Sequence, residues 1–234
     1  MALVAEHRAV LGVDIVGSAR LPGKHTAVAR RIALETVEAA LAERAVEVLH
    51  RSDTGDGALI TVPGARVADL LDAAHAIDAA LVEHNTWHRP EVRLRLSVES
   101  GPIGDTPDLY LPRKDAARLL DAEDFKRLLT RSLDPADESR ATTGLIVSDH
   151  VLRAAFAGDH TTRVRRAEFT PLPVRNKEFT TTAWVRIPGV DVKSLATPPT
   201  PQQPPPTITN NVGGDMHGIQ THTVNGNITL GGPR

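Results

Sequence analysis

Two aspartates occupy positions from which carboxylates can support metal-dependent chemistry. Asp14 ends a short apolar run, residues 9–14, which predicts a buried strand, and Asp56 lies in a Gly-rich turn cluster, residues 52–57. Aspartate is common in such turns for conformational reasons alone. If the two side chains converge, however, they supply the oxygen ligands that a hard divalent cation such as Mg²⁺ requires.

Glycines flank Asp56 and lie close to Asp14, at positions 12 and 17, and this favours phosphate binding next to the metal. Without a Cβ, the backbone can approach a phosphate closely. Val16, Gly17 and Ser18 also lead into the first predicted helix, where free backbone N–H groups bind anions. The sequence therefore predicts a site for a metal ion and a phosphorylated ligand at the end of the first strand.

The elements that must position these residues alternate along the chain. Hydrophobic periodicity predicts strands over 9–14, 46–51, 58–62, 92–98 and 144–148, helices over 25–44, 65–84, 115–129 (in one or two pieces) and 149–157, and a late hairpin over 163–168 and 181–187. The first six elements follow the order β-α-β-β-α-β. That order predicts an α+β, ferredoxin-like fold, an antiparallel sheet with helices on one face. Its first strand lies beside the hairpin, so the two acids should meet at one edge.

Composition excludes several classes of function. Among 234 residues there are 27 basic and 29 acidic side chains, and this balance argues against a nucleic-acid binder. The absence of Cys excludes disulfides, Cys-ligated zinc and thiol catalysis. No apolar run approaches the ~18 residues of a membrane span, and no secretory signal opens the chain, so we expect a cytoplasmic protein without a membrane partner.

Three regions are predicted along the chain. Residues 1–190 form the folded domain, residues 191–207 a Pro-rich linker, and residues 208–234 a Gly/Asn/Thr-rich tail. Alternation in Val224–Leu230, with low charge and Asn, is compatible with stacked strands. The tail resembles the short amyloid-type motifs of some bacterial defence proteins. That resemblance implies assembly with an effector protein that carries a similar motif; the alternative is a disordered tail.

An ordered series of motifs resembles class III nucleotidyl cyclases, the adenylate/guanylate type, over residues 9–187. The first metal motif of that family, Asp-Ile-x-Gly-Phe-Thr, is similar to residues 13–18, and its Gly-Asp hairpin to residues 53–57. Four later segments follow in the family's order: Leu94–Gly101, Asp115–Leu119, Leu145–Ser148 and Val174–Lys177. The resemblance implies conversion of a nucleoside triphosphate to a 3′,5′-cyclic monophosphate and pyrophosphate, a reaction used for signalling.

The resemblance also implies roles for individual residues. Asp14 and Asp56 would hold two Mg²⁺ or Mn²⁺ ions, helped by the backbone carbonyl of Ile15. Arg118 would reach the substrate from a partner subunit and stabilise the transition state, and Lys177 would contact the triphosphate. Because two chains build each site, a homodimer is implied.

Three departures from the family pattern leave a second interpretation open. Ser18 replaces the Phe of the first motif, Lys114 stands where the family has an Asn that orients the ribose, and Ser52 stands at the base-reading position. Lys114 either takes over a phosphate contact or marks a decayed site, and Ser52 leaves the base undetermined. The alternative is a catalytically decayed module that dimerises or binds nucleotide, with the tail mediating assembly.

Overall fold

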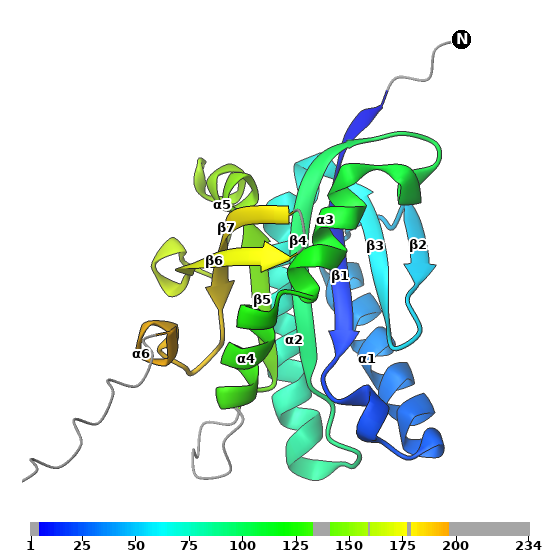
Figure 1. The fold of residues 1–234 in the computed structure, drawn as a ribbon. Coiled ribbons are helices and arrows are strands. Elements are labelled where there is room, and N and C mark those ends of the chain that lie inside the picture. Colours follow the sequence, from blue (N-terminus) through cyan, green and yellow to red (C-terminus); the bar gives the residue numbers. More distant parts are fainter. Residues whose placement is uncertain (1–4, 133–140, 159, 177–178, 197–234) are drawn as a thin grey trace, which may run out of the picture. The chain divides into compact units, whose positions relative to one another are not determined.

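Seven strands form one sheet in the computed structural model, which describes residues 5–132, 141–158, 160–176 and 179–196 (Figure 1). The strand order is β2-β3-β1-β4-β5-β7-β6. The strands are β1 (Glu6–Ile15), β2 (His50–Asp53), β3 (Gly57–Pro63), β4 (Leu94–Ile103), β5 (Thr143–Ser148), β6 (Thr170–Asn176) and β7 (Phe179–Arg186). All neighbouring strands are antiparallel except β4 and β5, so the predicted α+β sheet with β1 beside the hairpin is confirmed.

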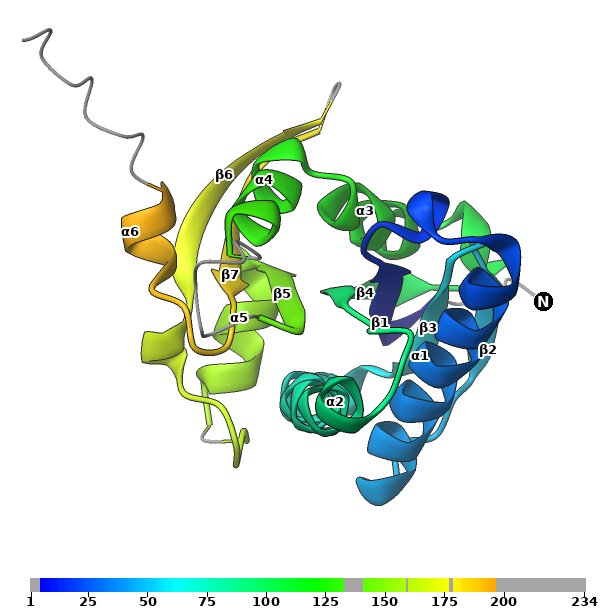
Figure 2. The ribbon, with the colours of Figure 1, turned by 90° about the horizontal axis from the view of Figure 1, so that it is seen from below.

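The helices cover both faces of this sheet. They are α1 (Gly23–Glu43), α2 (Val67–Trp87), α3 (Leu111–Leu120), α4 (Glu123–Arg131), α5 (Asp149–Phe156) and α6 (Val192–Ala196). Figure 2 shows α1 and α2 against one face and α3 and α4 against the other. Within the described residues no helix is long and apolar enough to cross a membrane.

The prediction of helices on one face holds for α1 and α2 of the first six elements, and α3 and α4 add a layer on the other face (Figure 2), for a reason that lies in the central strands. Val10 and Leu11 point to opposite faces of β1, yet neither has any exposed surface. Leu11 joins the large core under α1 and α2, whereas Val10 packs with Ile103 and Ala116 under α3. A continuous apolar run in a strand indicates burial on both sides, and residues 9–13 carry that signal.

Two predicted strands are also displaced. The hairpin expected from 163–168 begins instead at Thr170, because Glu168 ends a short 3₁₀ turn by accepting hydrogen bonds from Arg165 N–H and the Arg186 side chain. The strand expected over 46–51 pairs only from His50 onward, although Leu49 N–H already donates to Thr61. The predicted long helix over 115–129 is two helices, α3 and α4.

Helix α6 lies inside the stretch predicted as linker, residues 191–207. The remainder of that linker and the tail over 208–234 lie outside the described residues, so the division into three regions stays a prediction.

Candidate functional site

Backbone pairing brings the two predicted metal ligands together. Asp14 lies opposite Gly57 in the register of β1 and β3, and Asp56 immediately precedes Gly57 at the hairpin turn. A Cβ at Gly57 would lie 1.9 Å from the backbone oxygen of Val13, so only glycine permits this close approach. The convergence of the two acids is thus built into the sheet. We call the pair and its immediate neighbours, Ser18 and Arg95, the carboxylate edge.

The segment after β1 folds back over the hairpin turn. Gly17 adopts a left-handed backbone conformation, φ 73°, which turns the chain and starts a 3₁₀ turn at Ser18. The Ser18 hydroxyl then donates a 2.6 Å hydrogen bond to Asp56 Oδ2. Ser18, which stands where the resembling family has Phe, therefore orients one of the two acids.

Asp14 has a cationic partner and an anionic neighbour. Arg95, on β4, donates from Nε to Asp14 Oδ2 at 2.7 Å and pairs with it a second time through Nη2. Burial raises the pKa of Asp14; Arg95 opposes this rise, and the nearby Asp56 adds to it through its charge and a hydrogen bond. Two carboxylates held this close disfavour each other's charge, and a bound cation would relieve that repulsion. The donor set fits a hard divalent cation.

The edge offers few other ligands. The described residues contain no cluster of three or more His, Cys, Asp or Glu side chains that could hold a metal ion. Ile15 is buried at the end of β1, and Val16 N–H donates to Arg93 O at 2.9 Å. The amide of Val16 is therefore not free for a phosphate, which corrects that part of the predicted anion site. Within the described residues, no acceptor is recorded for the backbone N–H groups of Gly17 and Ser18, so these two remain candidates for the phosphate.

Arg30, which the sequence analysis did not single out, fastens the hairpin turn to α1. Its Nε donates to the backbone oxygen of Gly55 at 3.0 Å, and its Nη2 lies 3.0 Å from Asp53 Oδ2. The turn that carries Asp56 is thus held by a helix as well as by its own strands. Helical periodicity predicts that Arg30 lies on a partly exposed face of its helix. Nothing in the sequence, however, pairs it with the turn between β2 and β3.

Ser52 lies away from the carboxylate edge, in a cluster beneath the start of α3. Its hydroxyl donates to Asp108 at 2.9 Å and accepts from Arg113 Nη2 at 2.6 Å. Arg113 is buried, and it also bonds Asp108 and Thr61. The predicted base-reading hydroxyl is therefore already engaged. Sequence reasoning missed Arg113 because a charged residue on a helix is ordinarily solvated.

The other predicted site residues on α3 are Lys114 and Arg118. Lys114 is exposed. Arg118 pairs with Asp115 at 2.8 Å and lies 5.6 Å from the centre of the Phe179 ring. Among the described residues, no recorded interaction joins Lys114 or Arg118 to Asp14 or Asp56. Lys177 lies outside the described residues.

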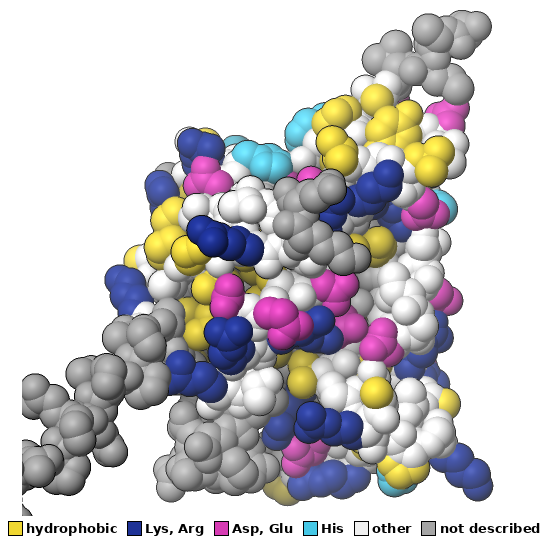
Figure 3. Space-filling view, viewed as in Figure 1, with side chains coloured by type: hydrophobic (Ala, Val, Ile, Leu, Met, Phe, Trp, Pro, Cys, Tyr) yellow, Lys and Arg dark blue, Asp and Glu magenta, His cyan; other side chains and the backbone are white. Residues whose placement is uncertain are grey.

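The surface around α3 is mixed in character. In the view of Figure 3, acidic and basic side chains alternate over α3 and α4. An apolar patch lies over the segment that leads into α3, where Leu109 and Leu111 are 67% and 64% exposed. The surface over α3, α4 and the segment that leads into α3 therefore offers both charged and apolar contacts.

Comparison with solved structures identifies the fold. The chain is similar to an adenylate/guanylate cyclase/hydrolase from Silicibacter pomeroyi, at 22% identity and a TM-score of 0.53, over 78% of this chain and 97% of that one. It is also similar to the guanylyl cyclase Cya2, at 11% identity and a TM-score of 0.54, over 80% of this chain and 93% of that one. A bacterial light-regulated adenylyl cyclase matches at 13% identity and a TM-score of 0.55, over 84% of this chain and 56% of that one.

These likenesses show that the described chain has the fold of adenylate/guanylate cyclase catalytic domains, as its motifs predicted. No protein-family model matches the sequence, and no curated protein matches it significantly. At such low identities the likeness establishes the fold, and activity has to be argued from the site itself.

Proposed function

We propose that this protein is a metal-dependent nucleotidyl cyclase that converts a nucleoside triphosphate into a 3′,5′-cyclic monophosphate and pyrophosphate. The observation that carries the proposal is the convergence of Asp14 and Asp56 at the end of β1 on a cyclase fold. Asp56 adds to the rise in the pKa of Asp14, so their closeness is unfavourable for Asp14 unless a cation binds between them.

Asp14, Asp56 and the Ile15 carbonyl would hold Mg²⁺ or Mn²⁺, two ions per site. When bound, such ions lower the pKa of the ribose 3′-hydroxyl and neutralise the phosphates. The chain's own residues prepare the site: Ser18 orients Asp56, and Arg95 orients Asp14. Much of the catalysis of phosphoryl transfer is positioning and charge stabilisation, which this rigid sheet edge suits.

A second copy of the chain would complete the site. Arg118 is half-exposed, and its planar fork suits a phosphate oxygen. Because Arg118 lies on α3, with no recorded contact to the carboxylate edge of its own chain, its reach toward a substrate requires a partner subunit. Lys114 and Lys177 would add positive charge from that same subunit. We therefore include a homodimer in the proposal.

One observation favours a second candidate, a module that binds nucleotide or dimerises without turnover. Arg95 already neutralises Asp14, and an incoming cation must share that carboxylate. In this case the tail over 208–234 would carry the protein's role, by assembling with an effector that bears a similar motif. A role in defence signalling belongs to either candidate.

The test is incubation of the full chain with each of the four ribonucleoside triphosphates and Mn²⁺, read by mass spectrometry. Asp56→Ala and the exposed-surface control Glu123→Ala are run alongside. A cyclic monophosphate made by the wild type and the control, and lost in Asp56→Ala, supports the cyclase and names its base. No product from any of the four would favour the second candidate, and a separate binding measurement would then show whether that module binds nucleotide or only dimerises.

A further inference from the structure

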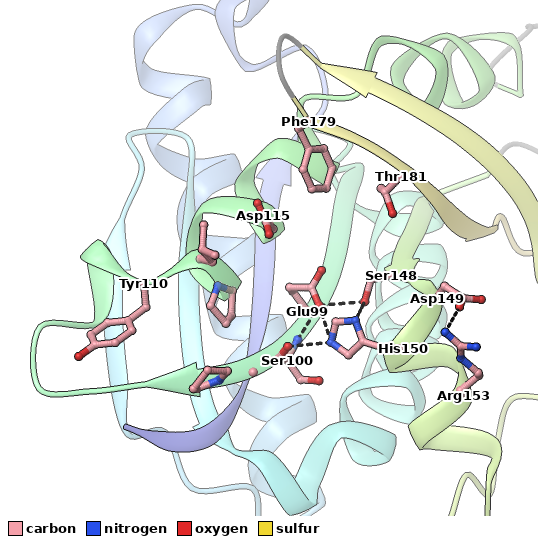
Figure 4. Close-up of a pocket in the computed structure, with 14 residues that line it drawn as sticks. Glu99, Ser100, Tyr110, Asp115, Ser148, Asp149, His150, Arg153, Phe179 and Thr181 are labelled. Atoms are coloured by element: carbon pink, nitrogen blue, oxygen red, sulfur yellow. Dashed lines mark hydrogen bonds and ion pairs between the residues drawn. The ribbon is translucent and has the colours of Figure 1, made fainter. Parts of the chain in front are cut away.

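A cavity of about 540 Å³ lies between α3 and α5, farther along the central strands from the carboxylate edge (Figure 4). Its floor is Glu99 of β4 and Ser148 at the end of β5. Glu99 pairs with Val10 in the register of β1 and β4, whereas the carboxylate edge begins at Asp14 and Arg95. The volume falls in the range of small-molecule sites.

The floor of the cavity holds a carboxylate with one oxygen bonded within the protein and the other open to the cavity. Glu99 is 5% exposed, and its Oε1 lies 2.8 Å from the donating Ser148 hydroxyl, 2.8 Å from the Ser100 N–H nitrogen and 2.9 Å from His150 Nε2. Within the described residues, no hydrogen bond or ion pair is recorded for Oε2. Figure 4 shows this second oxygen directed away from His150, toward the space between Asp115 and Thr181.

An acceptor that opens onto a cavity is available to a ligand. An N–H group placed in the cavity would donate a hydrogen bond to Glu99 Oε2, and a charged N–H group would form the stronger, charge-assisted kind. The floor therefore selects for a donor, and preferentially for a cation.

The walls define the rest of the ligand. Tyr110, Phe179, Pro102 and Pro112 supply apolar and aromatic surface. Two further acids, Asp115 and Asp149, line the cavity against Arg153 and the half-exposed His150. Asp149 pairs with Arg153, so that charge is balanced. Aromatic faces attract cations as well as apolar groups, which agrees with the charge of the floor.

We propose that this cavity binds a small organic cation, a protonated amine on a flat apolar body, whose N–H group donates to Glu99 Oε2. The site borders the proposed catalytic machinery. Asp115 forms the ion pair with Arg118, and Phe179 carries its ring beside the same guanidinium. A ligand in the cavity would therefore shift the position of Arg118 and regulate the cyclase. This regulatory effect rests on the proposed function, whereas binding of the cation does not.

Binding is tested without nucleotide, by titration calorimetry of the full chain with phenethylammonium chloride and, as the uncharged comparison, 2-phenylethanol. We expect saturable binding of the cation at one site per chain and binding of the alcohol at least tenfold weaker. Two variants address the cavity: Glu99→Gln replaces the oxygen with a competing donor, and Thr181→Trp fills the space from β7. Each should weaken binding of the cation at least tenfold, while Glu123→Gln on the surface leaves it unchanged.

The outcomes separate this proposal from the cyclase. No saturable heat with phenethylammonium at millimolar concentration overturns the cavity site, whatever the cyclase assay shows. Equal affinity in wild type and in a folded Thr181→Trp variant overturns it too, even if Glu99→Gln fails to fold. A cation that binds as expected but leaves product formation unchanged keeps the site and removes only its link to Arg118.

Discussion

Two aspartates, the buried Asp72 on α2 and the partly buried Asp14 on β1, have opposite environments. Asp72 is 1% exposed and accepts hydrogen bonds from the backbone N–H groups of Thr162, Arg163 and Val164, from the Thr162 hydroxyl and from Arg44. Although burial acts to raise the pKa of Asp72, these donors outweigh it and lower that pKa. Asp14 has one arginine and a second acid, and its pKa is raised.

The difference separates a structural carboxylate from a functional one. Donors surround Asp72 on every side, so its charge ties the loop over 162–164 to α2. Asp14 retains an unfavourable interaction that only an external cation would remove. Glu99 is intermediate, since one oxygen has three neighbours that donate and the other has none. Perturbed and unsatisfied acids cluster at functional sites, and these two are the ones we assign to ligands.

The largest expected effect is the loss of activity in Asp14→Asn. Cyclic nucleotide formation should fall at least about 100-fold, because the amide cannot replace a carboxylate as a metal ligand. The folded pKa of Asp14 is above its unfolded value, so its charge costs stability at neutral pH. The neutral amide should therefore leave the urea midpoint of the metal-free protein unchanged or higher. A clear fall in that midpoint would place Asp14 with Asp72 as a structural acid.

Asp72→Asn is the matched opposite. Removing this charge leaves several buried donors poorly paired, including Arg44, and should lower the free energy of unfolding by about 3 kcal/mol. At temperatures where the variant remains folded, turnover per folded molecule should stay near the wild-type value. Urea denaturation and a cyclase assay on the same preparation would measure both. An Asp72→Asn variant with wild-type stability and no activity would show that Asp72 is not the structural acid of the pair.

Gly57→Ala tests whether the backbone alone sets the carboxylate edge. The added methyl would collide with the Val13 carbonyl and push β1 from β3, which we expect to cost about 2 kcal/mol of stability and most of the activity. Gly23→Ala at the start of α1 is the control, because nothing lies within 4 Å of its Cβ position. Equal urea midpoints for the two variants would show that the strands can separate without loss.

Sequence patterns predicted the sheet and the meeting of Asp14 with Asp56 because both follow from local signals. An apolar run that ends in an acid predicts a strand with its acid at the edge, and a Gly-rich turn predicts the hairpin. Strand order then brings the acids together. The position of α3 and α4 on the second face was not predicted, because the two-sided burial of residues 9–13 depends on α3, which comes a hundred residues later.

Side-chain partners far apart in sequence were beyond reach. Nothing local connects Arg95 with Asp14, Arg113 with Ser52, or Glu99 with His150, since each pair spans separate elements whose packing decides the contact. Glu99 and Ser148 stand in motifs that were singled out, but an apolar strand context suggests only a core position. The unfilled oxygen of Glu99 emerges from tertiary structure alone.

The smallest expected effect is the pH-dependent contribution of His150, the partner of Glu99, to the stability of the fold. The hydrogen bond with Glu99 raises the pKa of His150 above 6.5, against the opposing effects of burial and of Arg153. Protonated His150 therefore stabilises the fold, fully below pH ~6.5 and progressively less as pH rises through the raised pKa. Compared with His150→Asn, the wild type should be more stable at pH 6, and the difference should shrink by pH 8.5.

The charged groups around His150 are Glu99, Asp149, Arg153 and, across the cavity, Asp115. Thermal melts of the wild type and of His150→Asn between pH 6 and 8.5 measure this difference in stability. A stability difference that stays constant with pH would mean that His150 remains neutral and that the floor of the cavity is still more negative than we infer.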